Sequence, residues 1–457
     1  MDLSVNQSAS TTKFIAFLVF AFTFGALMMV QAVLRPDAIA GVYFHGIPSE
    51  SMMQTVSILD LRDQPLVSLW NIHIQPPLFD AIRAVLASIS GATDTLQLQY
   101  EVDGAIYLIW AMAYGSICTV VFLWLSRLTN LLCGLVGALF FAASPAALLY
   151  ATLLETTLLS SLFILLLIFL LWRISRGEFV SPWVLSLIFL TLFFTRSVFQ
   201  WPWVVLLGVC LWLMNYPRDA INKFLLVSSL VIFLYLTKQF VLFGVSTTSS
   251  FSGLNLCQSI GACKPHHISE KIDGGEGVLP KVLTRERKLT GAHNFNHQVD
   301  LQLNKAYLQD FKDGVISKDL VELLGIYQKN ALIYFQPSSS YAGTNQLLVI
   351  LPERWRIYYE KIFSAPIFLA LLVFSLMFWL KEHNLKQWKS SLGVGLPVLA
   401  IFAISILFES GENMRFKFFI EPVLYIFIVS QLCIAGKYSW NYLVSVLAAI
   451  IGKANSS

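Results

Sequence analysis

The amino-acid sequence predicts an all-α polytopic membrane protein, and its composition and its hydrophobic pattern are the two observations that predict it. Hydrophobic residues make up 56% of the 457 residues and charged residues 13%, about half the share of charged residues in soluble chains. The mean hydropathy is +0.68. Apolar stretches of about 20 residues, the length that crosses a bilayer as a helix, recur along the chain between polar turns. We therefore expect about 10–11 transmembrane helices.

The apolar stretches give the positions of these helices. The first lacks a clear small-residue cleavage site, so we interpret it as a span rather than a signal peptide. Residues 438–451 are either a further span or an interfacial helix. The expected spans are 14–34, 105–125, 131–150, 156–171, 183–199, 201–214, 224–243, 362–380, 392–408 and 418–433.

The lysines and arginines of the short turns predict the orientation. Basic residues of short loops stay on the cytoplasmic side. Every second turn is basic, which predicts a cytoplasmic N-terminus; these residues are Arg127, Arg173, Arg176, Arg218, Lys223, Lys381, Lys386, Lys389 and Lys437. The bacterial inner membrane is favoured, and the endoplasmic reticulum membrane stays open.

This orientation divides the chain into three parts. Residues 1–243 form an N-terminal transmembrane module that contains an exoplasmic first loop, 35–104. Residues 244–361 form a larger exoplasmic loop domain, and residues 362–457 form a C-terminal transmembrane module. Cys257 and Cys263 are the only cysteines of the long loop, and they are either a disulfide, as an oxidising compartment allows, or two free thiols.

The first exoplasmic loop holds the main candidate for catalysis. Residues 43–83 are too polar and too rich in proline to be a span, and they gather acidic, basic and histidine side chains. We expect half of an active site here and the other half in later loops on the same side. Glu50 is either a general base or a first-turn carboxylate that the helix dipole favours.

The segment HIQPP, 73–77, follows in the same loop. Its two prolines stop a preceding helix and allow a new one from Leu78 onward. A rigid backbone of this kind can hold His73 and Gln75 in place to orient a substrate, whereas a plain turn would explain only the prolines.

Ionisable residues near the outer ends of spans are further candidates. Glu155 precedes the span 156–171, and a carboxylate at membrane depth usually faces a cavity or the protein interior. Arg196 and Lys238 either bind substrate or extend to lipid headgroups. In the turn 409–422, Glu412 and Arg415 are expected to bind substrate, since an arginine can hold a phosphate with two parallel donors; headgroup contact is the alternative for Arg415.

Several classes of site lack support in the sequence. It contains no H-E-x-x-H, no G-x-S-x-G and no paired C-x-x-C. It contains no nucleotide-binding glycine loop either, so we expect no nucleotide cofactor. The net charge of +4 follows from topology, and we expect no nucleic-acid partner. A divalent metal ion is compatible with the mixed ligands Glu50, His73 and Glu155.

Short segments along almost the whole chain resemble one family. They are the acidic first loop with HIQPP, SP…Y…E (144–155), NFNH…AY (294–307), YFQPSSSY (334–341) and GENMRF…P (411–422). Together they are similar to the polytopic GT-C glycosyltransferases, in particular the bacterial group related to protein O-mannosyltransferases and lipid A aminoarabinose transferases. The resemblance implies transfer of a sugar from a polyprenyl phosphate on the exoplasmic face.

The resemblance also implies a catalytic acid in the first loop, usually in an Asp-Glu pair. Here the pair aligns with Ser49 and Glu50, so the aspartate position is a serine. The base is therefore Glu50 or, alternatively, Asp37. Arg415, with Arg196 as second choice, is expected to hold the leaving phosphate, and Glu155 to bind a metal or order the loop.

A transferase of this kind would move the sugar to an exoplasmic lipid, glycan or protein, with inversion at the anomeric carbon. The alternative function is a transporter or flippase of lipid-linked sugars. Its gates would need polar residues on both sides of the membrane. The ionisable residues gather outside and the inside turns are short, which favours the enzyme.

Overall fold

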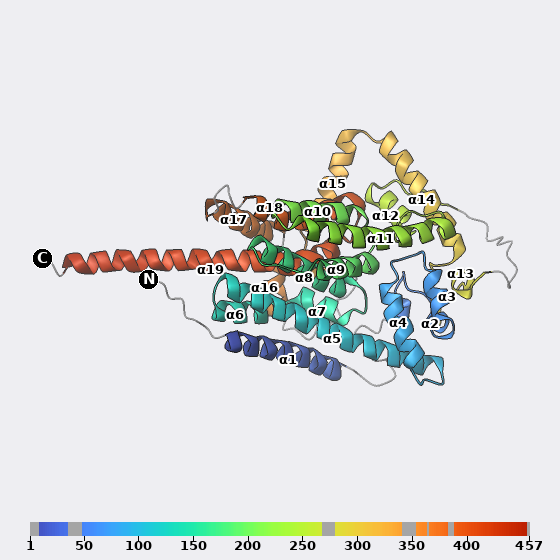
Figure 1. Ribbon diagram of the computed structural model, residues 1–457, viewed down its shortest axis with the longest axis horizontal. Helices are drawn as coiled ribbons and strands as arrows, with labels where there is room; N and C mark the ends of the chain where they lie inside the picture. Colours follow the sequence, from blue (N-terminus) through green and yellow to red (C-terminus); the bar gives the residue numbers. More distant parts are fainter. Residues whose placement is uncertain are drawn as a thin grey trace.

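The chain forms a bundle of helices with a smaller helical part at one end (Figure 1). The computed structural model describes residues 9–34, 48–266, 279–340, 353–362, 365–382 and 388–454. Within these ranges the secondary structure is helical, apart from one antiparallel bridge between Arg287 and His293. The predicted all-α class is thus confirmed for the described part of the chain.

Six helices are long and apolar enough to cross a membrane, which defines the fold of a polytopic membrane protein. The side of the membrane that each end faces stays a prediction. These helices are α1 (Ala9–Leu34), α5 (Thr95–Leu128), α8 (Thr157–Ser175), α11 (Arg218–Phe243), α18 (Trp388–Phe408) and α19 (Asn413–Ala454).

The remaining predicted spans are shorter or broken helices. The span expected at 131–150 is a pair, α6 (Leu131–Ala142) and α7 (Pro145–Thr152), bent by 58°. The break follows from Ser144, whose hydroxyl caps α7, and from Pro145 at the first helical position. Three more apolar helices are α9 (Pro182–Thr195), α10 (Pro202–Leu213) and α17 (Ala365–Glu382).

The expectation of about ten full spans is therefore corrected in part. With 14 and 12 residues, α9 and α10 are only about 21 and 18 Å long, less than the hydrocarbon thickness of about 30 Å. The proposed eleventh element at 438–451 is not separate either, because α19 continues without interruption to Ala454.

Helix α5 is the central element of the bundle. It packs against α1, α6, α8 and α19, and it carries Trp110 and Phe122, two of the largest fully buried side chains. It begins at Thr95, with the Asp94 side chain as its N-terminal cap. The helix thus begins ten residues before the expected span at 105, and its first turns lie beside the first loop.

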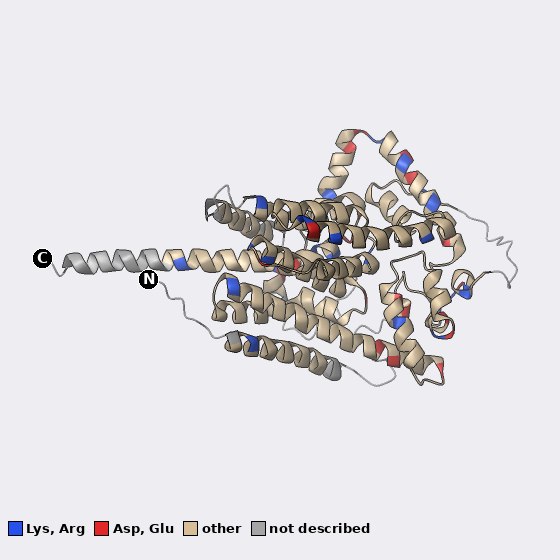
Figure 2. Ribbon diagram, viewed as in Figure 1, with Lys and Arg blue, Asp and Glu red and all other residues tan. Residues whose placement is uncertain are grey.

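Most helices of the first loop and of the long loop lie together at one end of the bundle, whereas α16 (Glu353–Ile362) packs against α7 and α17 within the bundle. The first loop contains η2 (Ser49–Ser51), α2 (Ile58–Asp63), α3 (Pro65–Trp70) and α4 (Leu78–Ile89). The long loop contains α12 (Ser252–Ser259), α13 (Lys281–Thr284), α14 (Gln298–Ser317), α15 (Leu320–Tyr334), η3 (Ser338–Ser340) and α16. At this loop end, acidic residues lie on α4, on the first turns of α5 and on α14, together with lysines and arginines (Figure 2).

The start of the long loop is fixed by a covalent link and a close helix contact. Cys257 and Cys263 form a disulfide with their Cα atoms 5.0 Å apart, as one of the two sequence interpretations expected. Helix α12 packs on α14 at Gly253, where a Cβ atom would lie 2.0 Å from the carbonyl oxygen of Asn304. Only glycine permits this approach.

Candidate active site

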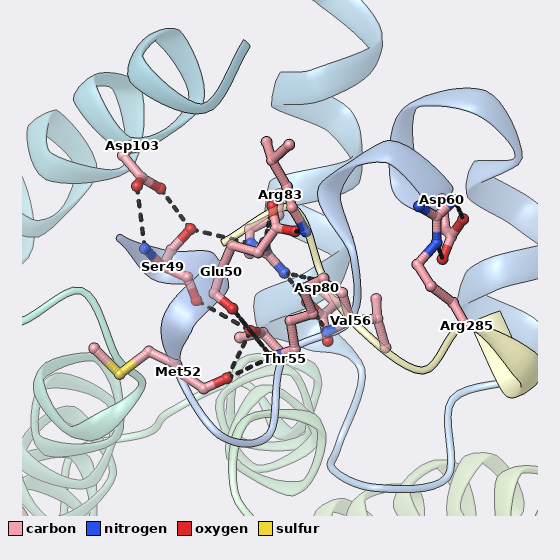
Figure 3. A network of polar contacts seen from close by, with 12 residues as sticks. Ser49, Glu50, Met52, Thr55, Val56, Asp60, Asp80, Arg83, Asp103 and Arg285 are labelled. Atoms are coloured by element: carbon pink, nitrogen blue, oxygen red, sulfur yellow. Dashed lines mark hydrogen bonds and ion pairs between the residues drawn. The ribbon is translucent and has the colours of Figure 1, made fainter. Parts of the chain in front are cut away.

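Glu50 lies in a single 3₁₀ turn, Ser49–Ser51, between Pro48 and Met52. The sequence allowed Ser49 to cap a longer helix here, but no side chain caps this turn. Instead the Ser49 hydroxyl donates to Asp103 Oδ1 on α5 at 2.5 Å, and its backbone N–H donates to Asp103 Oδ2 at 3.1 Å. The turn is thus held in place by α5, and Glu50 is presented to the interior of the loop region (Figure 3).

Arg83, on α4, is the centre of the polar network around this turn (Figure 3). Its guanidinium is fully buried and donates to Asp80 Oδ1 at 2.6 Å, to the Val56 carbonyl at 2.8 Å and to the Ser49 hydroxyl at 3.2 Å. Its Nη2 lies 4.0 Å from Glu50 Oε2, and neither atom has a hydrogen-bond partner among the described residues. Arg83 is therefore shared among several oxygens rather than paired with Glu50 alone.

A hairpin of the long loop, residues 285–294, covers the other side of Glu50. The Leu289 N–H donates to Glu50 Oε1 at 2.8 Å. The Lys288 ammonium is buried and donates to the carbonyls of Glu50 and Met52 and to the Thr55 hydroxyl, at 3.1, 2.7 and 3.1 Å. We name Glu50, Asp80, Arg83, Asp103 and Lys288 the loop cluster.

Burial decides the protonation of this cluster. Glu50 is fully enclosed, and burial raises the pKa of its carboxyl group, although the charge of Arg83 and the Leu289 N–H act in the opposite direction. Burial also lowers the pKa of Lys288 to about 7. A carboxyl group whose pKa is raised binds a proton more readily than an exposed one, which suits a residue that takes up a proton.

His73 and Gln75 lie next to this cluster, and both have partners within the protein. The Nδ1 and Nε2 atoms of His73 lie 2.8 Å from the Ser250 hydroxyl and from the Asn296 carbonyl of the long loop. Burial lowers the pKa of His73 to about 4, so the ring is neutral. The Gln75 amide donates to Asp80 Oδ2 at 2.7 Å. Both residues join the two loops, and their expected contact with substrate stays a prediction.

A second polar cluster lies where the ends of α8, α9, α18 and α19 meet. The Arg196 guanidinium forms an ion pair with Glu155 and donates to the Thr157 hydroxyl at 2.9 Å. Arg415 forms an ion pair with Glu412 at 2.9 Å. These four residues come from three predicted turns, and the two ion pairs meet at Glu409, on which the charges of both arginines act.

The carboxyl group of Glu409 completes this second cluster. Glu409 is buried in the turn between α18 and α19, and burial raises its pKa to about 7, although the charges of Arg415 and Arg196 oppose the shift. We name Glu155, Arg196, Glu409, Glu412 and Arg415 the helix-end cluster.

Helix α5 connects the two clusters. Asp103 contacts the loop cluster, and Trp110, seven residues later on the same face of the helix, donates from its indole N–H to the Glu155 carbonyl at 3.2 Å. Seven residues correspond to about 10 Å of helix rise. The Trp110 ring also packs on Phe79 of α4, next to Asp80. The helix-end cluster is thus about two turns deeper in the bundle than the loop cluster.

Lys238 belongs to neither cluster. Its ammonium lies 5.1 Å from the ring centre of Tyr235, 5.6 Å from Phe243 and 5.7 Å from Trp70, and it donates to the Ile72 carbonyl at 3.4 Å. The Lys238 side chain therefore connects the first loop to α11. Contact of this residue with substrate or with lipid headgroups stays a prediction.

The described part of the chain contains no set of side chains arranged as ligands for the metal ion that the sequence allows. No group of three or more His, Cys, Asp or Glu side chains is arranged there to hold an ion. Glu155 pairs with Arg196, and both ring nitrogens of His73 have protein partners. Dependence on a divalent metal stays a prediction. Asp37, the alternative base, lies outside the described residues.

Sequence reasoning missed three residues of these clusters. Asp103 lies two residues before the predicted start of a span. A charged residue so close to a span was the only indication that its side chain is buried. Lys288 belongs to the basic run RERK, which has the composition of a solvated loop. Glu409 was one of several acids in a turn, and nothing in the sequence marks it as the buried one.

No protein-family model matches the chain, and no curated protein matches it either. The fold and the sites therefore define a class only: a polytopic helical membrane protein with two buried clusters of ionisable residues at one end. The likeness to GT-C glycosyltransferases is carried by the short segments of the sequence alone.

Proposed function

We propose that this protein is an integral-membrane glycosyltransferase that moves a sugar from a polyprenyl-phosphate donor to an exoplasmic acceptor. One observation carries the proposal. Glu50 is fully buried at the loop end of the bundle, its pKa is raised by burial, and its Oε2 faces Arg83 Nη2 with no hydrogen-bond partner on either atom among the described residues. A structural carboxylate in such a place would normally have both oxygens satisfied.

The two partnerless atoms suit a hydroxyl group. A hydroxyl can donate its hydrogen to Glu50 Oε2 and accept a hydrogen bond from Arg83 Nη2. Glu50 then takes the proton as general base while the hydroxyl oxygen attacks the anomeric carbon. The bond between that carbon and the phosphate oxygen breaks, and its electron pair leaves with the phosphate. Attack from the side opposite the phosphate inverts the configuration.

Arg196 and Arg415 are the proposed phosphate ligands. Each is paired with a carboxylate in the present structure, Arg196 with Glu155 and Arg415 with Glu412. A guanidinium can exchange one planar acceptor for another, because carboxylate and phosphate offer it similar pairs of oxygens. The developing negative charge of the leaving phosphate would then be stabilised where two arginines lie close together.

The geometry also sets a condition for turnover. Leu289 and Lys288 close over Glu50, so the 285–294 hairpin has to move before an acceptor hydroxyl can reach Oε2. Closure around the substrate would exclude water from the reacting centre and protect the activated sugar from hydrolysis. Asp103 and Ser49 are positioning residues in this scheme, since they hold the turn and touch no reacting atom.

Purified protein in liposomes with radiolabelled polyprenyl-phosphate sugars tests the proposal. The expected result is transfer of label to an acceptor, with release of polyprenyl phosphate in equal amount. A panel of sugars and of lipid, glycan and peptide acceptors is required, because the described residues do not identify either substrate. Movement of labelled lipid between leaflets without product would overturn the enzyme and establish the transporter instead.

A further inference from the structure

The tip of the α14–α15 hairpin exposes a group of large apolar side chains. Their exposed fractions are far above those of ordinary loop residues in contact with a core, and they are contiguous across the turn between the two helices: Ile316 84%, Leu320 71%, Val321 79% and Leu324 57%. We name these four residues the tip patch. Single exposed apolar residues are common on soluble surfaces, but a contiguous group marks a surface that another apolar phase covers.

The base of the hairpin packs against the end of α18, one of the helices that are long and apolar enough to cross a membrane. The Asn330 amide on α15 donates to the Ile406 carbonyl at 3.1 Å, two residues before the end of the apolar helix α18. The Tyr334 ring packs at 5.1 Å on Phe402 of the same helix. The second half of α15 is therefore fixed to the last two turns of α18 at the loop end.

The direction of α15 places the tip beside the bundle. Figure 1 shows that α15 runs across the direction of the long helices α5 and α11 and extends to the side of the bundle. The ten residues from Asn330 back to Leu320 cover about 15 Å. A helix that is fixed to the end of α18 and runs across the bundle axis keeps its far end near the level at which α18 ends.

The end of α18, to which α15 is fixed, also exposes apolar side chains. Leu407 and Phe408 at the end of α18 are 37% and 43% exposed, next to the residue that Asn330 contacts. On α15 the apolar positions Leu320 and Leu324 are one turn apart, and Glu322 lies between them on another face. Leu320 and Leu324 therefore share one side of the helix, apart from Glu322.

We propose that the tip patch inserts into the headgroup–acyl boundary of the leaflet at the loop end. The occupant of this surface is the bilayer itself, since α15, which carries part of the patch, is fixed to the end of the apolar helix α18 and runs across the bundle axis. The hairpin then anchors the long loop to the membrane at a second point, away from the transmembrane helices. This inference rests on the exposure and direction of α14 and α15 and does not depend on the proposed enzymatic activity.

Depth-dependent quenching in nanodiscs tests the insertion. A V321C variant is labelled with an environment-sensitive NBD dye and placed in nanodiscs of phosphatidylcholine and phosphatidylglycerol, with or without lipid that carries a doxyl group at acyl carbon 5. The matched control is Q302C, an exposed position on the same α14, about 21 Å of helix rise before Ile316. The unsubstituted chain, labelled in parallel, gives the background from its own cysteines.

The expected result is blue-shifted emission and strong doxyl quenching at position 321, with red-shifted emission and efficient iodide quenching at position 302. Equal iodide quenching at both positions, without doxyl quenching at 321, would place the tip in water and overturn the proposal. Because valine and cysteine are similar in size and the site is exposed, the variant tests insertion without a change in folding.

Discussion

The loop cluster and the helix-end cluster contain the same kinds of charges but arrange them differently. Each has three carboxyl groups and two basic side chains, so each has one acid more than its bases can neutralise. In both, burial raises the pKa of one carboxyl group: that of Glu50 in the first and that of Glu409, to about 7, in the second. The surplus acid is thus a shared feature of the two clusters.

The difference lies in how the arginines are used. Arg196 and Arg415 each form a direct ion pair with one carboxylate. Arg83 is spread over Asp80, Val56 and Ser49, which leaves Glu50 at 4.0 Å. An arginine that donates to several oxygens, as Arg83 does, holds the backbone of a turn in place. An arginine that pairs with one carboxylate can exchange that carboxylate for another anion. The comparison therefore supports the proposal that the loop cluster transfers a proton and the helix-end cluster binds an anion.

The largest expected effect is that of Glu50→Gln on turnover. Glutamine keeps the shape of the side chain but cannot take a proton, so turnover should fall by about 10²–10⁴-fold. Expression and thermal stability should change little, because a neutral amide replaces a carboxyl group whose neutral form burial already favours. The measurement is product formation per folded molecule in liposomes.

Two further variants complete this test. Glu101→Gln changes an exposed carboxylate near the same end of α5 and should leave turnover unchanged. Asp37→Asn tests the alternative base. Full turnover in Glu50→Gln together with an inactive Asp37→Asn would move the base toward the first span.

The next largest effect concerns the fold of the loop cluster. Arg83→Ala leaves Glu50 and Asp80 buried without their cation, and loss of one partner from a buried charged network costs about 3–5 kcal/mol. We expect a large fall in the thermal unfolding midpoint. The control is Arg62→Ala, since Arg62 and Asp63 form an exposed pair that contributes about 1 kcal/mol or less. Equal midpoints for the two variants would contradict a central role for Arg83.

The surplus acid of the helix-end cluster predicts a pH dependence. Because the pKa of Glu409 is raised in the folded protein, its contribution favours the fold fully below about pH 4.5 and is lost as the pH rises through about 7. The total change is roughly 3 kcal/mol. Unfolding midpoints between pH 5 and 8 should fall more steeply for the natural chain than for Glu409→Gln. Parallel pH profiles would show that Glu409 does not titrate in this range.

The sequence predicted the helical class and the positions of the apolar helices, because these depend on local patterns of hydrophobicity. It also predicted that a later loop meets the first one, from the polar residues that both loops contain. The break between α6 and α7 was missed although Ser144 and Pro145 signal it, because an apolar window of 20 residues averages over a cap. An apolar stretch was thus enough to predict a helix, but not to predict a break inside that stretch.

The composition of the clusters was less accessible. Glu50 and Leu289 are 239 positions apart, and their contact depends on how the long loop folds back onto the first. Ser49 likewise donates two hydrogen bonds to Asp103, which is 54 positions away in the sequence. Such pairings depend on three-dimensional packing, and a single sequence contains no signal for them.

A smaller effect is expected for the proposed phosphate ligand. Arg415→Ala removes a charge-assisted contact of about 1.5–3 kcal/mol, so the donor concentration for half-maximal rate should rise roughly 10–100-fold. Arg415→Lys keeps the charge but loses the planar pair of donors. Its donor concentration for half-maximal rate should lie between those of the natural chain and Arg415→Ala. Arg176→Ala, an exposed arginine at the other end of α8, is the control. Unchanged donor kinetics in Arg415→Ala would remove this residue from the site.

The smallest expected effect is that of Glu412→Gln, which tests whether Arg415 binds the donor phosphate by removing the competitor of that phosphate. Glu412 is the ion-pair partner of Arg415 and its side chain is 40% exposed, so the pair contributes about 1 kcal/mol or less to stability. Glu412→Gln removes a carboxylate that competes with the donor phosphate for Arg415. The donor concentration for half-maximal rate should therefore fall about two- to fivefold, within the roughly 1 kcal/mol that such a pair provides. A rise instead would show that Glu412 itself binds the donor, as a contact to a sugar hydroxyl would require.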